Sequence, residues 1–298
     1  MHSAHHMKAQ RARVNWVDVV AVAVTLFFAL LIVVPFINVV AISFSTQQGY
    51  YAHRFMLFPA DPTLKNYQEL FKDGRIWVGY RTSMTLVAIG VPLNMLLTTS
   101  LAYATSRPAY PGKKLFLGLM LFTMLFSGGI VPLYLQLKEM SLTNTIWAVL
   151  LTGTVNTFNM VIMRNYFLSM PESLLESAKL DGAGEWTVLG SIVIPLSMPI
   201  LATISLFYLV DRWNEWYAAM IFIRKASLTT LQLVLRSIVI DLQKVSTVES
   251  GESLSQMQKF EMGMKMGAIA VTILPVMCVF PFLQKHFTKG IMIGAIKI

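Results

Sequence analysis

Aromatic and charged side chains gather in one short segment of this chain. The segment covers positions 208–217 and reads Tyr-Leu-Val-Asp-Arg-Trp-Asn-Glu-Trp-Tyr. Aromatic faces pack against the apolar faces of sugar rings, while carboxylates and amides exchange hydrogen bonds with hydroxyl groups. These residue types therefore suit a ligand rich in hydroxyl groups. The candidate ligand-binding residues are Tyr208, Asp211, Arg212, Trp213, Asn214, Glu215 and Trp216.

A second polar segment, at positions 169–199, has the pattern of two short helices separated by a glycine. Ser169 and Glu172 have the spacing of a capping box, which predicts a helix start. Gly182 stands where a helix end favours a residue that tolerates positive φ, and Pro195 opens the next hydrophobic run. The apolar face of the first helix comprises Leu174, Leu175 and Ala178. The apolar side of the second turn comprises Trp186, Leu189, Ile192 and Val193.

The sequence offers little for covalent or metal chemistry. It contains no H-E-x-x-H or G-x-S-x-G pattern, and none of its five histidines lies in the middle of a hydrophobic run. The single cysteine, Cys278, excludes a disulfide framework within the chain. No G-x-x-x-x-G-K-[ST] phosphate loop is present, so any ATP must be bound by another subunit. An intramembrane enzyme is therefore disfavoured.

Composition places the chain in a membrane. It is 55% hydrophobic and only 13% charged, with a mean hydropathy of +0.61, whereas soluble domains carry about 25% charged residues. A spanning helix needs about 20 apolar residues, and the runs do not alternate as barrel strands do. We therefore predict an all-α membrane protein with six transmembrane helices. The charge-free runs that predict them are 19–53, 82–106, 115–137, 140–163, 186–210 and 266–284.

The distribution of basic residues predicts the topology. The turn at 107–114 contains Arg107, Lys113 and Lys114, which places it in the cytoplasm. Six spans then put both termini and the segment 169–199 in the cytoplasm too. The net charge of +9 is spread over loops and tails without a dense basic block, so nucleic-acid binding has little support. The predicted parts are a tail at 1–18, a membrane domain at 19–290, extracytoplasmic loops at 46–80 and 218–264, and a tail at 291–298.

Two interpretations of the segment 208–217 remain open in this topology. On a straight helix Asp211 lies about 24 Å beyond Pro195, close to the outer interface. The segment then forms either an aromatic belt in which Asp211 and Arg212 pair locally, or the mouth of a translocation path, because charged residues at membrane depth usually face a cavity. The loop that follows contains Leu231, Leu235 and Ile238 at helical spacing, which predicts a short helix on the membrane or on a partner.

The segment 169–199 resembles the EAA loop of ABC importer permeases. The likeness is carried by Glu176-Ser177-Ala178, Asp181-Gly182-Ala183 and the ending Ile192-Val193-Ile194-Pro195. Ser177 replaces the usual alanine, and Ile194 the usual leucine. The resemblance implies that this loop is a coupling helix docking onto an ATPase subunit. Glu176 would pair with a cation there, Gly182 would permit the turn, and Leu174, Leu175 and Ala178 would fill the groove; Asp181 and Pro195 complete the pattern.

Nearly the whole chain is similar to the carbohydrate branch of these permeases, of the second maltose permease kind. The segments that carry this likeness are 126–134, 213–216, 231–236 and 290–297. The likeness extends to permeases for oligosaccharides cut from polysaccharides, including the alginate importer's second permease. It implies the type I importer permease fold, a non-identical second permease, two ATPase subunits that bind ATP and Mg²⁺, and an extracytoplasmic binding protein.

The sequence leaves open which substrate is transported and what energy source drives the transport. A slight excess of Lys and Arg in the outer loops suits an acidic sugar such as a uronate, although large loops often carry such an excess. An amino-acid or peptide permease is the alternative within the same class. A secondary transporter would need carboxylates or broken helices near mid-membrane, whereas Asp211 and Glu215 are expected near an interface.

Overall fold

The computed structural model describes residues 16–53, 55–108, 111–247 and 261–295, and these are helical with short connections. The only strand-like pairing among them is an isolated bridge between Ser45 and Pro62. The helices are α1 (Trp16–Ser43), α2 (Gln47–Ala52), α3 (Lys65–Lys72), α4 (Gly74–Ser106), α5 (Lys113–Leu125), α6 (Ile130–Glu139), α7 (Ile146–Leu151), α8 (Thr157–Leu168), α9 (Glu172–Leu180), α10 (Glu185–Val188), a π-helical turn (Leu189–Val193), α11 (Ile194–Leu196), α12 (Met198–Trp213), α13 (Tyr217–Phe222), a 3₁₀ turn (Ala226–Leu228), α14 (Leu231–Thr247) and α16 (Glu261–Ala295).

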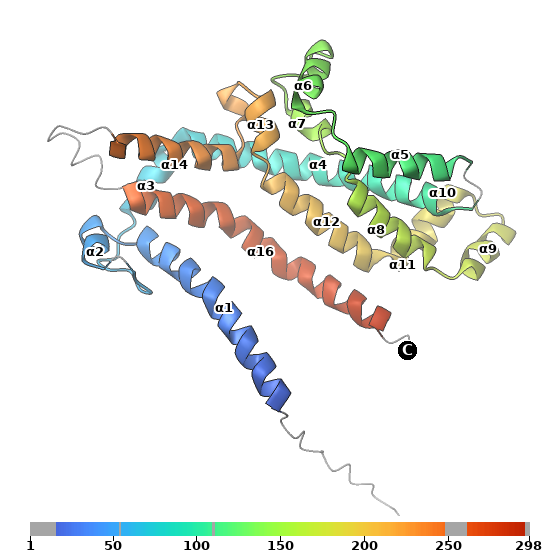
Figure 1. Ribbon diagram of the computed structural model, residues 1–298, viewed down its shortest axis with the longest axis horizontal. Coiled ribbons are helices and arrows are strands. Elements are labelled where there is room, and N and C mark those ends of the chain that lie inside the picture. Colours follow the sequence, from blue (N-terminus) through green and yellow to red (C-terminus); the bar gives the residue numbers. More distant parts are fainter. Residues whose placement is uncertain (1–15, 54, 109–110, 248–260, 296–298) are drawn as a thin grey trace, which may run out of the picture.

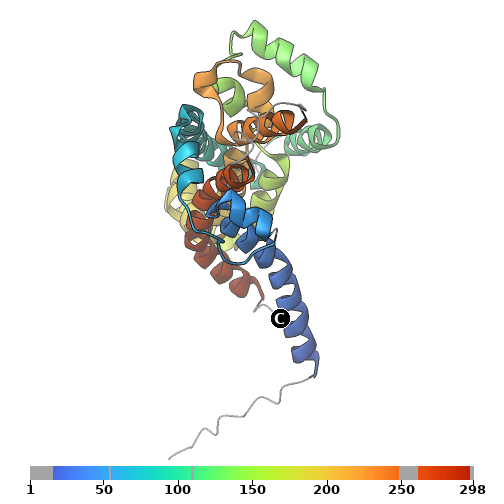
Figure 2. The same ribbon diagram turned by 90° about the vertical axis from the view of Figure 1, so that its left-hand side faces the viewer.

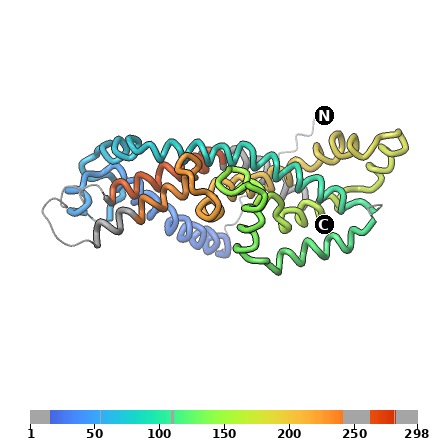
Figure 3. Tube along the Cα trace, turned by 90° about the horizontal axis from the view of Figure 1, so that it is seen from above, coloured from blue at the N-terminus to red at the C-terminus, as the bar shows by residue number. Residues whose placement is uncertain are grey.

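Helix α4 is the element around which the others pack. It contacts α8, α12 and α14 along its length, and it runs along the long axis of the molecule (Figure 1). Helices α2 and α3 lie at one end of that axis, whereas α9 and the start of α5 lie at the opposite end (Figure 3). A buried cluster that includes Met163, Phe167 and Tyr208 joins α4, α8 and α12.

The six charge-free runs were expected to form six transmembrane helices, and in the structure several of these runs are not single straight helices. Three helices of the described residues are long and apolar enough to cross a membrane unbroken, namely α1, α4 and the 262–279 part of α16. Two bent helix pairs are long and apolar enough only when taken together: α5 with α6, at 114°, and Glu185–Leu196 with α12, at 85°. The fourth run divides into the short helices α7 and α8. The charge-free runs therefore predicted apolar segments but not the bends and breaks within them.

Glycines mark two of these interruptions. Gly129 precedes α6 with φ +86°, and Gly153 lies between α7 and α8 with φ +76°. A β-carbon at Gly153 would meet nothing within 4 Å, and one at Gly129 would meet only Pro132, at 3.9 Å. These glycines therefore supply a left-handed backbone conformation that other residues adopt at a cost, rather than a close approach of two helices.

Helix α1 leaves most of its apolar surface uncovered. No residue in the most hydrophobic 18-residue stretch of α1 is buried within the chain. The buried residues of α1 are confined to its C-terminal end, at Ala41, Ile42 and Ser43. There it packs against α16, and the rest of the helix extends away from the other elements (Figure 2). A membrane or another subunit must cover this surface.

Helix α14 confirms the predicted helical segment after residue 230 but not its expected location. Leu231, Val234 and Ile238 are each at most 4% exposed, because α14 packs against α4 and α16 of its own chain. Helix α16 in turn continues to Ala295, into the stretch expected as a C-terminal tail. The N-terminal tail lies outside the described residues up to position 15.

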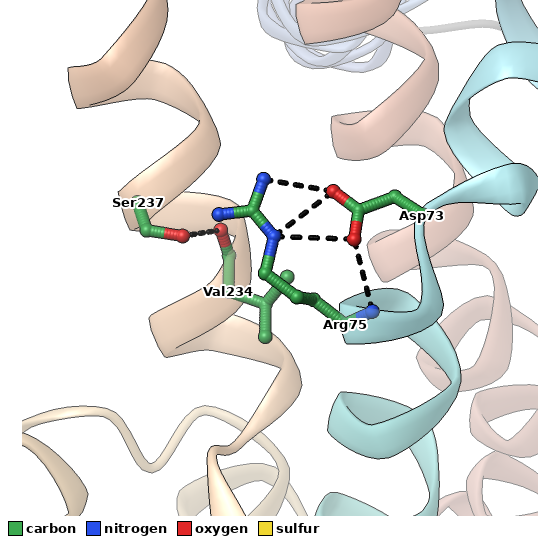
Figure 4. A network of polar contacts seen from close by, with 4 residues as sticks. All are labelled: Asp73, Arg75, Val234 and Ser237. Carbon is green, nitrogen blue, oxygen red and sulfur yellow. Dashed lines mark hydrogen bonds and ion pairs between the residues drawn. The ribbon is translucent and has the colours of Figure 1, made fainter. Parts of the chain in front are cut away.

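The N-terminus of α4 is capped beside α14, as Figure 4 shows. The Asp73 carboxylate accepts a hydrogen bond from the Arg75 backbone N–H at 2.9 Å and from Arg75 Nη2 at 2.8 Å. The Arg75 side chain thereby holds the pKa of Asp73 below its usual value, although partial burial opposes this. On the facing helix, Ser237 Oγ donates to the Val234 carbonyl at 2.7 Å. Arg75, Val234 and Ser237 border a cavity of about 350 Å³.

Candidate functional site

Helix α9 is the first helix of the segment 169–199, and it starts differently from the prediction. Pro171 occupies the N-cap position, and no side chain caps the helix. Ser169 instead ends α8, and its hydroxyl donates to the Tyr166 carbonyl at 2.7 Å. The predicted capping box between Ser169 and Glu172 is therefore wrong, because Ser169 belongs to the preceding helix end.

The end of α9 agrees with the glycine prediction. Gly182 has φ +82°, and a β-carbon there would meet nothing within 4 Å. The Ala183 N–H donates to the Ala178 carbonyl at 2.9 Å, and the Gly182 N–H donates to the Lys179 carbonyl at 3.0 Å. This pair of bonds is a Schellman motif, which satisfies carbonyls left free at a helix end. The sharp turn therefore depends on backbone conformation and not on space.

The two faces of α9 divide the predicted coupling residues. Leu175 is only 7% exposed and packs with α8 and α10 residues of its own chain, and Ala178 borders the same cluster. These two side chains hold α9 in place and are not free to enter another subunit. Leu174 is 47% exposed, and Leu180, which the sequence analysis did not single out, is 88% exposed. The polar residues among the predicted coupling residues, Glu176, Ser177 and Asp181, are all exposed.

A polar network ties the end of α9 to α4. Glu185, at the start of α10, accepts a hydrogen bond from Lys179 Nζ at 2.6 Å. Its other oxygen accepts from the Tyr103 hydroxyl at 2.6 Å. One carboxylate therefore links three helices. Beyond it, Trp186 is 80% exposed rather than on the buried side of the turn, and Pro195 lies exposed just before the 85° bend.

The candidate ligand-binding residues surround a cavity of about 420 Å³ at the C-terminal end of α12. Tyr208, Asp211, Arg212, Asn214, Glu215 and Trp216 line it, whereas Trp213 does not. Trp213 is 3% exposed, and its indole N–H donates to the Thr272 carbonyl in α16 at 3.1 Å. The lining residues that the sequence analysis missed are Asn94, Thr152, Gly153, Val155, Asn156 and Tyr217.

Arg212 does not pair with Asp211 by a hydrogen bond in the structure, because its guanidinium group faces a helix end. Nη1 donates to the Val149 carbonyl at 2.8 Å, and Nη2 donates to the Leu150 carbonyl at 2.8 Å. Nη2 also donates to Asn94 Oδ1 at 3.0 Å. The cation thus caps the C-terminus of α7, whose last carbonyls have no partner within the helix.

The structure does not fit the straight-helix estimate for the position of Asp211. Asn94 precedes Arg107 by thirteen residues of sequence, which corresponds to about 20 Å along a helix. The bend before Met198 shortens the path from Pro195, so the rise assumed for Asp211 does not hold. The cavity lies beside the break between α7 and α8, and breaks of this kind in membrane proteins usually border a cavity.

The side chains that remain available in the cavity are mainly acceptors and aromatic faces. Asp211 is exposed. Glu215 uses one oxygen to accept the Ala218 N–H at 2.9 Å, and Asn214 Oδ1 accepts from Gln232 at 3.0 Å. Trp216 is 40% exposed, and Arg236 lies 5.0 Å from the centre of its ring. Hydroxyl groups could donate to these oxygens while a ring packs against Trp216.

Residues 97–293 match the family model of the binding-protein-dependent transport system inner membrane component. The match includes α9, the bend before α12 and most of the cavity. The chain belongs to this family. Its helical class and its permease fold are thereby confirmed, and the family likeness agrees with the resemblance of the segment 169–199.

Three similar proteins cover nearly the whole chain. The polygalacturonan/rhamnogalacturonan transport system permease protein YtcP of Bacillus subtilis is 38% identical over 94% of this chain and 98% of its own. Protein LplC of the same species is 35% identical, covering 100% of this chain and 99% of its own. A crystal structure of a bacterial ABC transporter involved in the import of the acidic polysaccharide alginate contains a chain with a TM-score of 0.81 and 29% identity, covering 92% of this chain and 99% of that one.

Proposed function

We propose that this permease forms half of the translocation path of an ATP-driven oligosaccharide importer. The observation that carries the proposal is the cavity of about 420 Å³, where two carboxylates, three amides and aromatic faces meet inside an otherwise apolar membrane protein. That lining suits hydroxyl groups and sugar rings. Similar proteins named for the transport of polygalacturonan and alginate support an oligosaccharide as the substrate.

The coupling step in this proposal occurs at α9. ATP and Mg²⁺ would be bound by two ATPase subunits, since this sequence contains no phosphate loop. An ATPase groove would receive the exposed side chains Leu174 and Leu180, and Glu176 would meet a cation there. Leu175 would pass the displacement into the core cluster to which it belongs. The Glu185 network would pass it to α4.

A second, non-identical permease would complete the path. In support, the apolar surface of α1 is uncovered within the chain. An extracytoplasmic binding protein would deliver the sugar to the end of the molecule formed by α2, α3 and α14. In this topology the protein lies in the cytoplasmic membrane, with both termini and α9 on the cytoplasmic side.

An acidic oligosaccharide is the finer proposal, and two features bear on it. A relative of known structure is described as importing an acidic polysaccharide. Within the cavity, however, the Arg212 guanidinium is occupied by carbonyls, and Asp211 and Glu215 are negative. A uronate carboxylate would therefore have to be recognised by the second permease or by the binding protein. Binding of neutral and acidic oligosaccharides to the binding protein would distinguish the two classes.

Reconstitution tests the proposed function. The permease pair, the ATPase and the binding protein would be placed in liposomes with ATP inside or outside, and uptake of labelled oligosaccharides, amino acids and peptides would be followed. We expect oligosaccharide uptake only with ATP on the α9 side and binding protein on the other. Uptake without ATP, driven by an ion gradient, would indicate a secondary transporter. Uptake of amino acids or peptides alone would indicate the other permease class.

A further inference from the structure

Two adjoining cavities form one groove along the second half of α4. One has a volume of about 440 Å³ and is bordered by Pro92, Met95 and Leu201. The other, of about 550 Å³, is bordered by Leu101, Ala104 and Arg107. Both are bordered by Ser100, Trp186 and Leu189, which makes them continuous. The groove therefore runs from the middle of α4 to its cytoplasmic end, and hydrocarbon side chains line most of it.

A cation with two unpaired nitrogens among the described residues lies at the cytoplasmic end of this groove. The Nε and Nη2 atoms of Arg107 are buried, and neither has a hydrogen-bond partner among the residues that the structure describes. The guanidinium group lies 4.3 Å from the centre of the Tyr103 ring. Buried polar groups are rarely left unpaired in native proteins, so these two nitrogens point to an absent acceptor.

The nearest carboxylate does not supply that acceptor. Glu185 also borders the groove, but its oxygens accept hydrogen bonds from Lys179 and Tyr103. With Arg107 and Lys179 each positive and Glu185 negative, the group has a net charge of +1. One further lysine, Lys113, lies beside this group and donates to the Arg107 carbonyl at 3.3 Å. The end of the groove therefore favours an anion.

We propose that this groove binds an anionic phospholipid, with its phosphate on Arg107 and an acyl chain along α4 past Trp186. Basic pockets between helices on the cytoplasmic side bind such headgroups. A guanidinium group suits phosphate oxygens, to which it offers parallel N–H donors. The exposed indole of Trp186 has the interfacial position typical of tryptophan. Inorganic phosphate would satisfy Arg107 but would leave Leu101 and Leu189 uncovered.

Lipid binding to the purified full-length chain in detergent tests the proposal, with native mass spectrometry as the readout. Phosphatidylglycerol and phosphatidylcholine of equal chain length would be the probes. We expect Arg107→Gln to weaken phosphatidylglycerol binding about tenfold, as loss of a charge-assisted contact does. The control Lys114→Gln removes an exposed cation from the same turn, outside the groove, and should leave binding unchanged.

A second variant tests the acyl-chain part of the groove without changing its charge. Ala104→Phe should fill the groove beside Leu101 and weaken binding of phosphatidylglycerol, while glycerol phosphate should compete poorly with the lipid. The proposal is overturned if Arg107→Gln and Lys114→Gln have equal effects. It is also overturned if glycerol phosphate competes as well as the lipid does, or if a photo-cross-linker at Trp186 joins the second permease instead of lipid in the assembled transporter.

Discussion

Replacing Arg212 with methionine should destabilise the membrane core without changing its apolar packing much. The arginine side chain is 3% exposed and donates to the carbonyls of Val149 and Leu150 and to Asn94 Oδ1, with a longer bond to the Thr152 carbonyl at 3.3 Å. Methionine has a similar length and no donor. The substitution therefore leaves the C-terminus of α7 uncapped inside the protein.

The size of the effect follows from the number and kind of these bonds. Side-chain hydrogen bonds within membrane proteins contribute about 0.6 kcal/mol each, which sets a lower bound of about 2.5 kcal/mol for four of them. Hydrogen bonds to charged groups contribute about 1.5 kcal/mol or more each, which sets an upper value of about 6 kcal/mol. We expect Arg212→Met to lower the free energy of unfolding by about 3–5 kcal/mol, or the melting temperature by roughly 10 °C.

Unfolding of the purified protein in mixed micelles, followed by tryptophan fluorescence, measures this loss. Arg212→Lys should recover part of it, because an ammonium group supplies three donors but not the planar fork. The control Asp211→Asn changes the adjacent exposed residue and should cost less than about 1 kcal/mol. Equal stability of Arg212→Met and the wild type would refute the reasoning that Arg212 holds the broken helix together.

Four further predictions concern the two candidate sites and the extracytoplasmic end. Gly182→Ala should impose about 1–2 kcal/mol of backbone strain at φ +82°, and it should lower uptake in liposomes while membrane insertion stays normal. The control Gly184→Ala changes a glycine outside the left-handed region and should have little effect on uptake. Glu185→Ala should uncouple ATP hydrolysis from uptake, so that ATP consumed per sugar rises; an unchanged ratio would show that the link to α4 is not used. Trp216→Ala should weaken oligosaccharide binding about three- to tenfold, as loss of an aromatic contact does, in a titration of the permease pair, and equal affinity would remove Trp216 from the path. Arg75 lowers the pKa of Asp73, so the stabilisation that this pair gives to the start of α4 should be present above the ordinary carboxylate pKa of about 3.9. It should be lost as the pH falls through the lower pKa of the folded state. Amide exchange near residue 75 should show that loss in the wild type but not in Asp73→Asn.

For the segment 169–199, the sequence predicted the turn at Gly182 but not which side chains of α9 are buried. Gly182 with its neighbours specifies a helix end through local backbone preferences, and those act over a few residues. Which of Leu174, Leu175 and Leu180 is buried depends on how α9 packs against α8 and α10, and this is a tertiary property. Helical spacing therefore grouped Leu174 with Leu175, although the structure buries only the second.

The sequence predicted only one wall of the cavity, because only the residues of that wall are neighbours in the chain. Clustered polar and aromatic residues at 208–217 marked one wall, since such residues are unusual after a long apolar run. The other wall comes from Asn94 and from the break that contains Gly153 and Asn156, which are more than fifty residues earlier in the sequence. A polar residue in the middle of the run 82–106 was an available signal for Asn94. Nothing local indicated that Trp213 would turn towards α16.

The placement of α9 against an ATP-hydrolysing subunit is the claim on which the account depends most. A photo-cross-linking residue at Leu180, which is 88% exposed, tests it in membranes that contain the assembled transporter, with the same residue at Leu189, 6% exposed, as the control. The account predicts a product between the Leu180 variant and an ATPase subunit and none from the Leu189 variant. If the Leu180 variant forms no product with an ATP-hydrolysing protein, α9 is not the coupling element.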